Sequence, residues 1–302
     1  MNNTKKKSPI SWVPTAYFAM GLPFVVLNMV TVLMFKGLEV DDKLITFWTS
    51  LILLPWTLKP LWSPFLELFR TKKFFVIVTQ LITGVTFGLV AFALNLSHFF
   101  SISIALLAIV AFSGATHDIA CDGVYMSELS NEDQAKFIGW QGAFYNIAKI
   151  LATGGLVYLA GYFIELNADA GLLTANKRAW MIILLILSVT MILLGIYHLF
   201  ALPSTQSASS KKTLRSNKEV MKELGQVLMD FFRKTHITYY ICFIILYRFA
   251  EGFVMKIVPL FLKADREMGG LGLNEKEIGL YYGTYGAAAF VLGSLLAGYY
   301  IA

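Results

Sequence analysis

Residues 179–202 read AWMIILLILSVTMILLGIYHLFAL, which is 24 consecutive positions without Asp, Glu, Lys or Arg. An α-helix needs about 20 mainly apolar residues to cross the hydrocarbon core of a bilayer. This stretch therefore predicts a membrane-spanning helix, and the rest of the chain can be compared with it.

Seven other segments meet the same requirement. The eight predicted spans are residues 12–35, 44–66, 74–95, 99–120, 137–163, 179–202, 237–262 and 278–301. Most connections between them are short and polar, as expected where neighbouring helices run antiparallel. Membrane-spanning β-strands would appear as alternating segments of about 10 residues, and the sequence has none. The fold class predicted is an all-α integral membrane protein with eight transmembrane helices.

Composition supports this prediction and excludes several function classes. Apolar residues make up 57% of the chain and charged residues 15%, whereas soluble domains carry about 25% charged residues. The net charge is +6, but the basic residues cluster beside apolar segments, which indicates membrane topology and not nucleic-acid binding. Cys121 and Cys242 lie far apart in apolar stretches and are interpreted as packing residues. No P-loop, HExxH motif or cysteine cluster occurs, so we expect no enzyme activity, ATP-driven pumping, cofactor or metal site.

The basic residues also predict the orientation of the chain. Lys5, Lys6 and Lys7 precede an apolar run that is too long for a signal peptide and lacks a cleavage site. Fourteen Lys and Arg residues fall on the N-terminal side of the predicted membrane and seven on the other side. Without the basic residues of the central segment, 203–236, each side has seven. The orientation then depends on the Lys and Arg residues at the N-terminus and in the loop after the second predicted helix. The positive-inside rule then predicts a cytoplasmic N-terminus.

The longest connection, residues 203–236, divides the predicted helices after the sixth. It begins with a Ser-rich stretch and continues with an apolar stripe at helical spacing, made of Val220, Leu224, Val227, Leu228 and Phe231. The stripe is either an amphipathic helix on the cytoplasmic membrane surface or a solvated linker helix. The domain organisation predicted is a six-helix half (1–202), a cytoplasmic connector (203–236) and two helices of a second half (237–302).

The two halves show an internal echo. Asp41 and Asn274, both suited to cap a helix, begin the similar stretches 41–45 and 274–278. Residues 19–21, Ala-Met-Gly, likewise correspond to residues 250–252, Ala-Glu-Gly. Parallel repeats of six helices joined by a long loop are similar to the plan of the major facilitator superfamily. By that plan twelve helices are expected, and the chain is interpreted as C-terminally truncated.

Two carboxylates in the fourth helix are the first candidates for function. Asp118 and Asp122 are one helical turn apart, beside His117 and Tyr125. A charge at membrane depth costs about 2.5–3.5 kcal/mol on insertion scales, so such residues default to functional hypotheses. Repulsion between two nearby carboxylates favours proton binding by one of them. The pair is therefore a candidate for proton coupling or gating, and the alternative is ordinary contacts at a helix end.

The seventh and second helices carry further ionisable candidates. Arg248 and Glu251 are three residues apart and can pair on one helix face, either as a structural ion pair or for substrate and proton coupling. Arginine binds carboxylate and phosphate groups through two parallel hydrogen bonds. Lys59 either extends toward the cytoplasmic surface or contributes to the substrate site.

Polar and small residues indicate a cavity and a packing seam. Gln141, Tyr145 and Lys149 form a polar stripe on the fifth helix that should face a cavity, and Asn28 in the first helix is assigned to the same substrate site. Small residues permit close helix packing. They are Gly154, Gly155 and Gly161 in the fifth helix and Gly279, Gly283, Gly286, Gly293 and Gly298 in the eighth.

Two motifs carry a family resemblance. Residues 59–67, KPLWSPFLE, resemble the pattern K-x-L-W-S-P-L-x-D, and residues 115–123, ATHDIACDG, resemble A-[ST]-x-D-I-x-x-D-[AG]. Both patterns, together with Gly21-Leu22-Pro23, are typical of the AmpG-type muropeptide permeases, a branch of the major facilitator superfamily near the acetyl-CoA transporters. The resemblance covers the N-terminal half well and the remainder loosely.

The resemblance implies a function and a gate. In the superfamily an acidic residue followed by basic residues forms a cytoplasmic gate after the second helix, and here Glu67, Arg70, Lys72 and Lys73 occupy that region. The implied activity is proton-coupled import of muropeptides or anhydromuramyl sugars across the bacterial inner membrane. We expect a monomer in the lipid bilayer that binds a small-molecule solute and protons. Two alternatives stay open: a facilitator for another solute, such as a sugar or an acyl-CoA, and a membrane receptor or complex subunit that does not transport.

Overall fold

The computed structural model describes residues 7–63, 66, 71–203, 225–226, 229–230 and 232–289, without the side chains at positions 248 and 251. Within these ranges the chain forms helices and no β-strand. Six helical stretches of this part are long and apolar enough to cross a membrane: 9–37, 42–61, 72–93, 99–128, 131–166 and 172–201. The all-α prediction and the first six predicted spans are confirmed.

The first two spans are irregular. The first contains η1 (Pro9–Ser11), α1 (Val13–Val25), the π-helical segment η2 (Val26–Val30) and α2 (Thr31–Gly37). The second contains α3 (Asp42–Leu51), α4 (Leu54–Leu58) and the 3₁₀ turn η3 (Lys59–Leu61). The predicted second span is confirmed over its described residues, but its helix is interrupted near Pro55 and Pro60, which lack the N–H that a helix interior requires. At the first break the Leu53 amide donates to the Ser50 carbonyl at 3.2 Å, a 3₁₀-type bond.

Of the next four spans, the first has its predicted length shifted by two residues, and the other three are longer than predicted. The four spans are α6 (Lys72–Ala93), α7 (Phe99–Glu128), the combination of α8 (Asn131–Ile150), η4 (Leu151–Leu156) and α9 (Val157–Leu166), and, after the 3₁₀ turn η5 (Ala168–Ala170), α10 (Leu172–Ala201). The predicted ends at 120 and 137 are wrong because hydropathy marks the apolar core, whereas the helices continue into polar sequence. Ser130 caps α8, with its Oγ accepting from the Asp133 amide at 3.1 Å.

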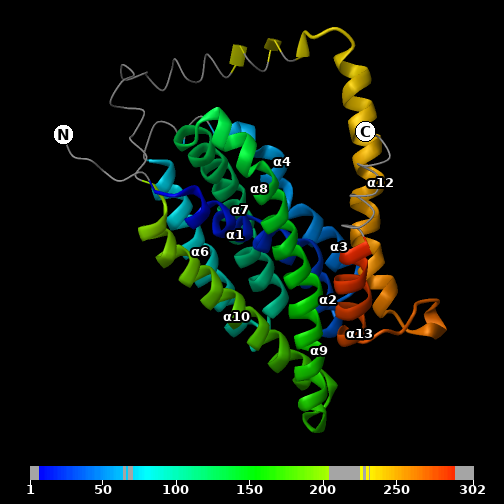
Figure 1. The fold of residues 1–302 in the computed structure, drawn as a ribbon. Coiled ribbons are helices and arrows are strands. Elements are labelled where there is room, and N and C mark those ends of the chain that lie inside the picture. The colour runs from blue at the N-terminus through cyan, green and yellow to red at the C-terminus, as the bar shows by residue number, and fades with distance from the viewer. Residues whose placement is uncertain are drawn as a thin grey trace.

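The six spans form one bundle that alternates in direction (Figure 1). Its core is mainly aliphatic and aromatic, with Leu33, Phe87, Leu107 and Trp180 at most 1% exposed. The Lys73 ammonium donates to the Leu202 carbonyl at 2.9 Å, which ties the start of α6 to the end of α10. The start of α6 and the end of α10, both predicted to lie on the N-terminal side of the membrane, therefore lie together.

The chain then continues into α12 (Ile237–Lys263), η7 (Arg266–Met268), α13 (Glu275–Ile278) and the π-helical segment η8 (Gly279–Tyr285). The first half of α12 stands apart from the bundle, and its last turns reach α2 and α3 (Figure 1). Tyr239 and Leu246 are 68% and 71% exposed, whereas Lys256 is 6% exposed. The bundle and α12 thus meet at one end. The central stripe (220, 224, 227, 228 and 231) and the predicted eighth helix beyond residue 289 lie outside the described residues.

The predicted helix caps are confirmed. The Asp41 carboxylate accepts from the Lys43 and Leu44 amides at 2.9 and 3.3 Å. Asn274 and Glu277 form a reciprocal capping box, with both hydrogen bonds at 2.9 Å. The two echoed stretches therefore begin their helices in similar ways.

Glycines let the fifth span pack closely against α13 and η8. A β-carbon at Gly283 would lie 2.2 Å from the Thr153 carbonyl oxygen, and one at Gly279 would lie 2.4 Å from the Tyr158 amide nitrogen. The predicted seam is confirmed at Gly154, Gly161, Gly279 and Gly283. It is wrong at Gly155 and Gly286, where a β-carbon would meet only atoms of its own helix, and Gly293 and Gly298 lie outside the described residues.

Candidate functional site

A partly buried ion pair joins the second span to α7, with the Lys59 side chain 28% exposed. The Lys59 ammonium lies 2.6 Å from Asp118 Oδ2, and Trp56 Nε1 donates to the same oxygen at 2.9 Å. Asp118 is only 8% exposed. Its other oxygen, Oδ1, is buried and receives no hydrogen bond from any described residue. Oδ2 therefore accepts both interhelical hydrogen bonds, and Oδ1 is available to bind a proton.

Local geometry explains how this pair forms. Trp56 and Lys59 are three residues apart around the break of the second span, which places them on one face. The Trp56 ring packs edge-to-face on Phe24, with ring centres 5.3 Å apart. Gly114, one turn before Asp118, makes room for the indole, since a β-carbon there would lie 2.8 Å from Trp56 Cζ2. The sequence prediction missed Trp56, because a contact between two spans distant in sequence follows from tertiary packing.

Asp122 binds a different helix. Its Oδ1 accepts a 2.8 Å hydrogen bond from the Tyr17 hydroxyl in α1, and the Tyr17 ring packs edge-to-face on Tyr125. Asp118 thus contacts the second span and Asp122 contacts the first. The two carboxylates that the spacing placed on one face belong to two separate interhelical contacts.

The remaining predicted residues lie in varied surroundings. Asn28 is buried, and its side-chain amide donates to the Phe24 carbonyl of its own helix at 2.9 Å. Gln141, Tyr145 and Lys149 are half-buried along α8. Tyr145 lies against the first span, where a β-carbon at Gly21 would be 3.0 Å from the Tyr145 carbonyl oxygen.

The Lys59 ammonium lies 2.6 Å from Asp118 Oδ2, and its side chain is 28% exposed, so it both pairs with α7 and reaches the surface of the bundle. Glu67 and Arg70 lie outside the described residues, as do the side chains of Arg248 and Glu251. Their predicted roles stay predictions.

The sequence of the chain matches a protein-family model, the Major Facilitator Superfamily, over residues 15–302. The chain belongs to the major facilitator superfamily. It is therefore a multi-pass membrane protein of a transporter family. No curated protein matches the sequence, and the family match does not distinguish the muropeptide permease branch.

A solved structure of a superfamily transporter resembles this one. It is a bacterial homologue of the human lysosomal transporter Spinster, in an inward-facing and unoccupied conformation, and it matches with a TM-score of 0.69 at 15% sequence identity. The match covers 98% of this chain and 62% of that chain, so this chain spans less than two thirds of the length of that transporter. At this identity the likeness shows the major facilitator fold alone.

A second buried polar cluster holds the facilitator bundle together, and the sequence prediction missed it. Gln80 in α6 bridges two histidines, with its Nε2 2.9 Å from His117 Nε2 and its Oε1 2.9 Å from His198 Nδ1. His198 Nε2 in turn lies 2.9 Å from Thr15 Oγ1 in α1. Gln80 and His198 are fully buried. The cluster links α1, α6, α7 and α10 next to Asp118.

Removing the bridging amide should destabilise this bundle. Gln80→Leu removes the hydrogen-bond partner of His117 Nε2 and of His198 Nδ1, which we expect to cost about 1–3 kcal/mol of unfolding free energy. The measurement is the thermal unfolding midpoint in detergent, with Gln226→Leu at an exposed position as the matched control. Equal midpoints for the two variants would show that the bridge contributes no stability.

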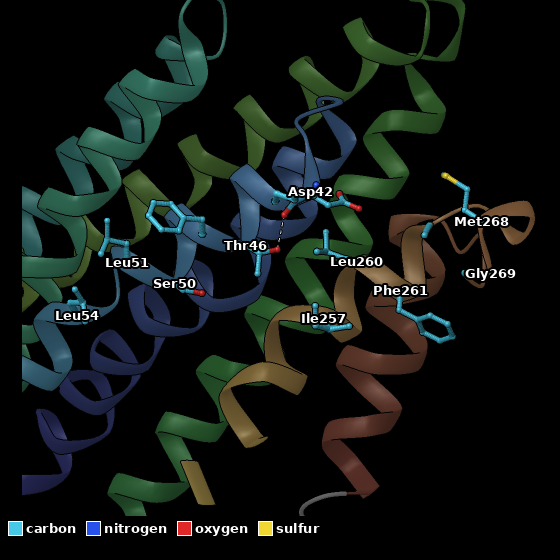
Figure 2. A pocket seen from close by; sticks show the side chains of 14 residues that line it. Asp42, Thr46, Ser50, Leu51, Leu54, Ile257, Leu260, Phe261, Met268 and Gly269 are labelled. Carbon is cyan, nitrogen blue, oxygen red and sulfur yellow. Dashed lines mark hydrogen bonds between the residues drawn. The ribbon is translucent and has the colours of Figure 1, made fainter. Parts of the chain in front are cut away.

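An apolar groove lies between α3 and α12 (Figure 2). Its volume is about 920 Å³. Thr46, Ser50 and Leu51 line one wall, and Ile257 and Phe261 line the other. Side chains therefore do not fill the space between these two helices at the end where α12 meets the bundle.

Proposed function

We propose that this major facilitator protein is a proton-coupled symporter that imports an anionic, cell-wall-derived solute, a muropeptide or anhydromuramyl sugar, by alternating access. The observation that carries the proposal is the partly buried ion pair between Asp118 and Lys59. The proposed direction of import, the coupling ion and the substrate go beyond membership of the family.

A coupling group must bind a proton at a place where its charge controls a contact between moving parts. Asp118 meets this requirement because its charged form holds Lys59 and Trp56, both in the broken second span. A proton on the unpartnered Oδ1 removes the charge opposite Lys59 and weakens that contact. Protonation of Asp118 therefore frees the Lys59 ammonium to bind an anionic solute.

The proposed solute class rests on the resemblance of residues 59–67 and 115–123 to muropeptide permease motifs. These two motifs contain Lys59 and Asp118, the two ends of the ion pair. The proposed solute site adds the half-buried stripe of Gln141, Tyr145 and Lys149 on α8. Arg248 and Asn28 complete the proposed set, and Glu251, Glu67 and Arg70 are proposed to act with Asp118 and Asp122 in coupling and gating.

We further propose a monomer in a bacterial inner membrane with its N-terminus in the cytoplasm, in two halves joined by residues 203–236. The excess of Lys and Arg on the N-terminal side supports this orientation. With this orientation, the separation between α12 and the bundle opens toward the cytoplasm (Figure 1). The packed end, with the glycine seam, is then the closed outer gate.

Uptake of labelled solute by intact cells expressing the protein tests the proposal. We expect accumulation of N-acetylglucosaminyl-anhydromuramyl sugar, and we expect a protonophore to abolish it because the proton gradient drives the cycle. Cells without the protein are the control. Accumulation that persists with the protonophore contradicts proton coupling, and uptake of a sugar or an acyl-CoA in its place identifies another facilitator.

A further inference from the structure

Lys256 in α12 is buried, and none of the functions above uses it. Its ammonium donates to the backbone carbonyl of Asn28 in η2 at 3.2 Å and to that of Thr49 in α3 at 3.3 Å. The side chain is 6% exposed, and no described carboxylate lies within ion-pair distance of it. One lysine thus ties α12 to both irregular spans of the bundle.

The acceptors are available because of those irregularities. The amide of Leu53, which would bind the Thr49 carbonyl in a regular helix, donates to the Ser50 carbonyl instead. Pro55 lies just beyond and prevents the helix from continuing regularly. The Asn28 carbonyl lies within the π-helical segment η2, and a carbonyl oxygen has two lone pairs with which to accept. Both breaks therefore face the same ammonium.

The hydrogen bonds of Lys256 are polar contacts in a loosely packed interface between α12 and the first two spans. Ser50 and Ile257, the neighbours in sequence of Thr49 and Lys256, line opposite walls of the open groove (Figure 2). At 3.2 and 3.3 Å, the two hydrogen bonds lie at and just beyond the long end of the usual range. Among the described residues the ammonium is held by two carbonyls, and such an ammonium is less stabilised than one paired with a carboxylate. Such a contact can hold two helices together and still release.

We propose that Lys256 is a positioning residue that latches α12 to the first two spans and so holds this end of the molecule closed. The proposal rests on the alternating-access function proposed above, since it assigns the latch to the closed gate of that cycle. Release of Lys256 from the two carbonyls accompanies the opening of this end. A lysine with a purely structural role would affect stability without changing the balance between the two conformations.

Spin-label distances measured without solute test the latch. One label pair, Leu166→Cys with Met268→Cys, reports on the packed end, and a second pair, Met126→Cys with Tyr239→Cys, reports on the open end. All four positions are more than 60% exposed. The background carries Cys242→Ser, because Cys242 is exposed and the other cysteine, Cys121, is buried.

With Lys256→Met we expect the ratio of long to short distances at the packed end to rise about tenfold, the effect of losing a charge-assisted contact. The open-end pair should shorten correspondingly. Lys43→Met, at an exposed lysine on the same end, should leave both distributions unchanged. Unchanged distributions in Lys256→Met overturn the proposal.

Pro55→Ala provides a second test in case Lys256→Met does not fold. Alanine restores the missing amide and lets the Leu53 amide return to the Thr49 carbonyl, which competes with Lys256 for that acceptor. We expect a shift in the same direction, and parent-like distances in this variant contradict the latch. If the unmutated protein does not transport the solute, the proposed function is refuted but the latch is not. The spin-label distances are measured without solute and do not depend on its transport.

Discussion

Asp118→Asn is expected to reduce the initial rate of solute uptake about 100-fold. Removing one partner of a fully buried ion pair costs about 3–5 kcal/mol, and the cost here is smaller because the Lys59 side chain is 28% exposed. A barrier increase of about 2.8 kcal/mol, at about 1.4 kcal/mol for each factor of ten in rate, gives the expected 100-fold reduction. Asparagine keeps the size of the side chain and can still accept from Trp56, but it cannot take up and release the proton. It also leaves the Lys59 ammonium without its anion. The measurement is uptake at matched protein levels in the membrane.

Two controls separate coupling from folding. Asp169→Asn removes an exposed carboxylate in η5 and should transport at the parent rate. The double variant Asp118→Asn with Lys59→Met removes both charges, so we expect it to recover thermal stability without recovering uptake. Uptake by Asp118→Asn within about twofold of the parent, equivalent to less than about 0.5 kcal/mol, would exclude Asp118 as the coupling group.

Gly283→Ala is expected to separate the fifth span from η8 and to lower the thermal unfolding midpoint by about 5 °C. The new β-carbon would lie 2.2 Å from the Thr153 carbonyl oxygen and 2.4 Å from Gly154 Cα, both backbone atoms that cannot rotate away. Overpacking of this kind costs about 1–3 kcal/mol, and each 1 kcal/mol shifts the midpoint by about 2–4 °C for a chain of this size class.

Gly286→Ala is the matched control for this prediction. It makes the same chemical change three residues later, where a β-carbon meets only Tyr281 of its own helix at 3.6 Å. Both variants gain the same helix propensity from alanine, so the difference between their midpoints isolates the clash. Midpoints that agree within about 1 °C, or about 0.3–0.5 kcal/mol, would show that the helices do not approach at Gly283 as described.

Length and composition predicted most of the fold, because a spanning helix requires an apolar run that few other structures share. The caps at Asp41 and Asn274 were also predictable, since capping is local chemistry within four residues. The breaks of the first and second spans were not predicted. Pro55 and Pro60 signalled the second break, whereas the π-helical segment after Pro23 depends on packing that the local sequence does not contain.

The candidate site was predictable only as single residues. The i, i+4 spacing of Asp118 and Asp122 correctly placed both on α7, but their partners come from spans distant in sequence, Trp56 and Lys59 for one and Tyr17 for the other. Pairings over such separations follow from tertiary packing. The Gln80 bridge was missed for the same reason, because a glutamine inside an apolar helix carries no sequence signal of what it binds.

Counterflow in proteoliposomes made with the full-length protein would distinguish transport from binding. Vesicles are loaded with unlabelled anhydromuramyl sugar, and a trace of labelled sugar is added outside without any ion gradient. If the protein is a carrier, the label accumulates transiently inside to a level above that in protein-free vesicles. Measurable binding of the sugar with no such overshoot would contradict transport and identify the protein as a membrane receptor or complex subunit.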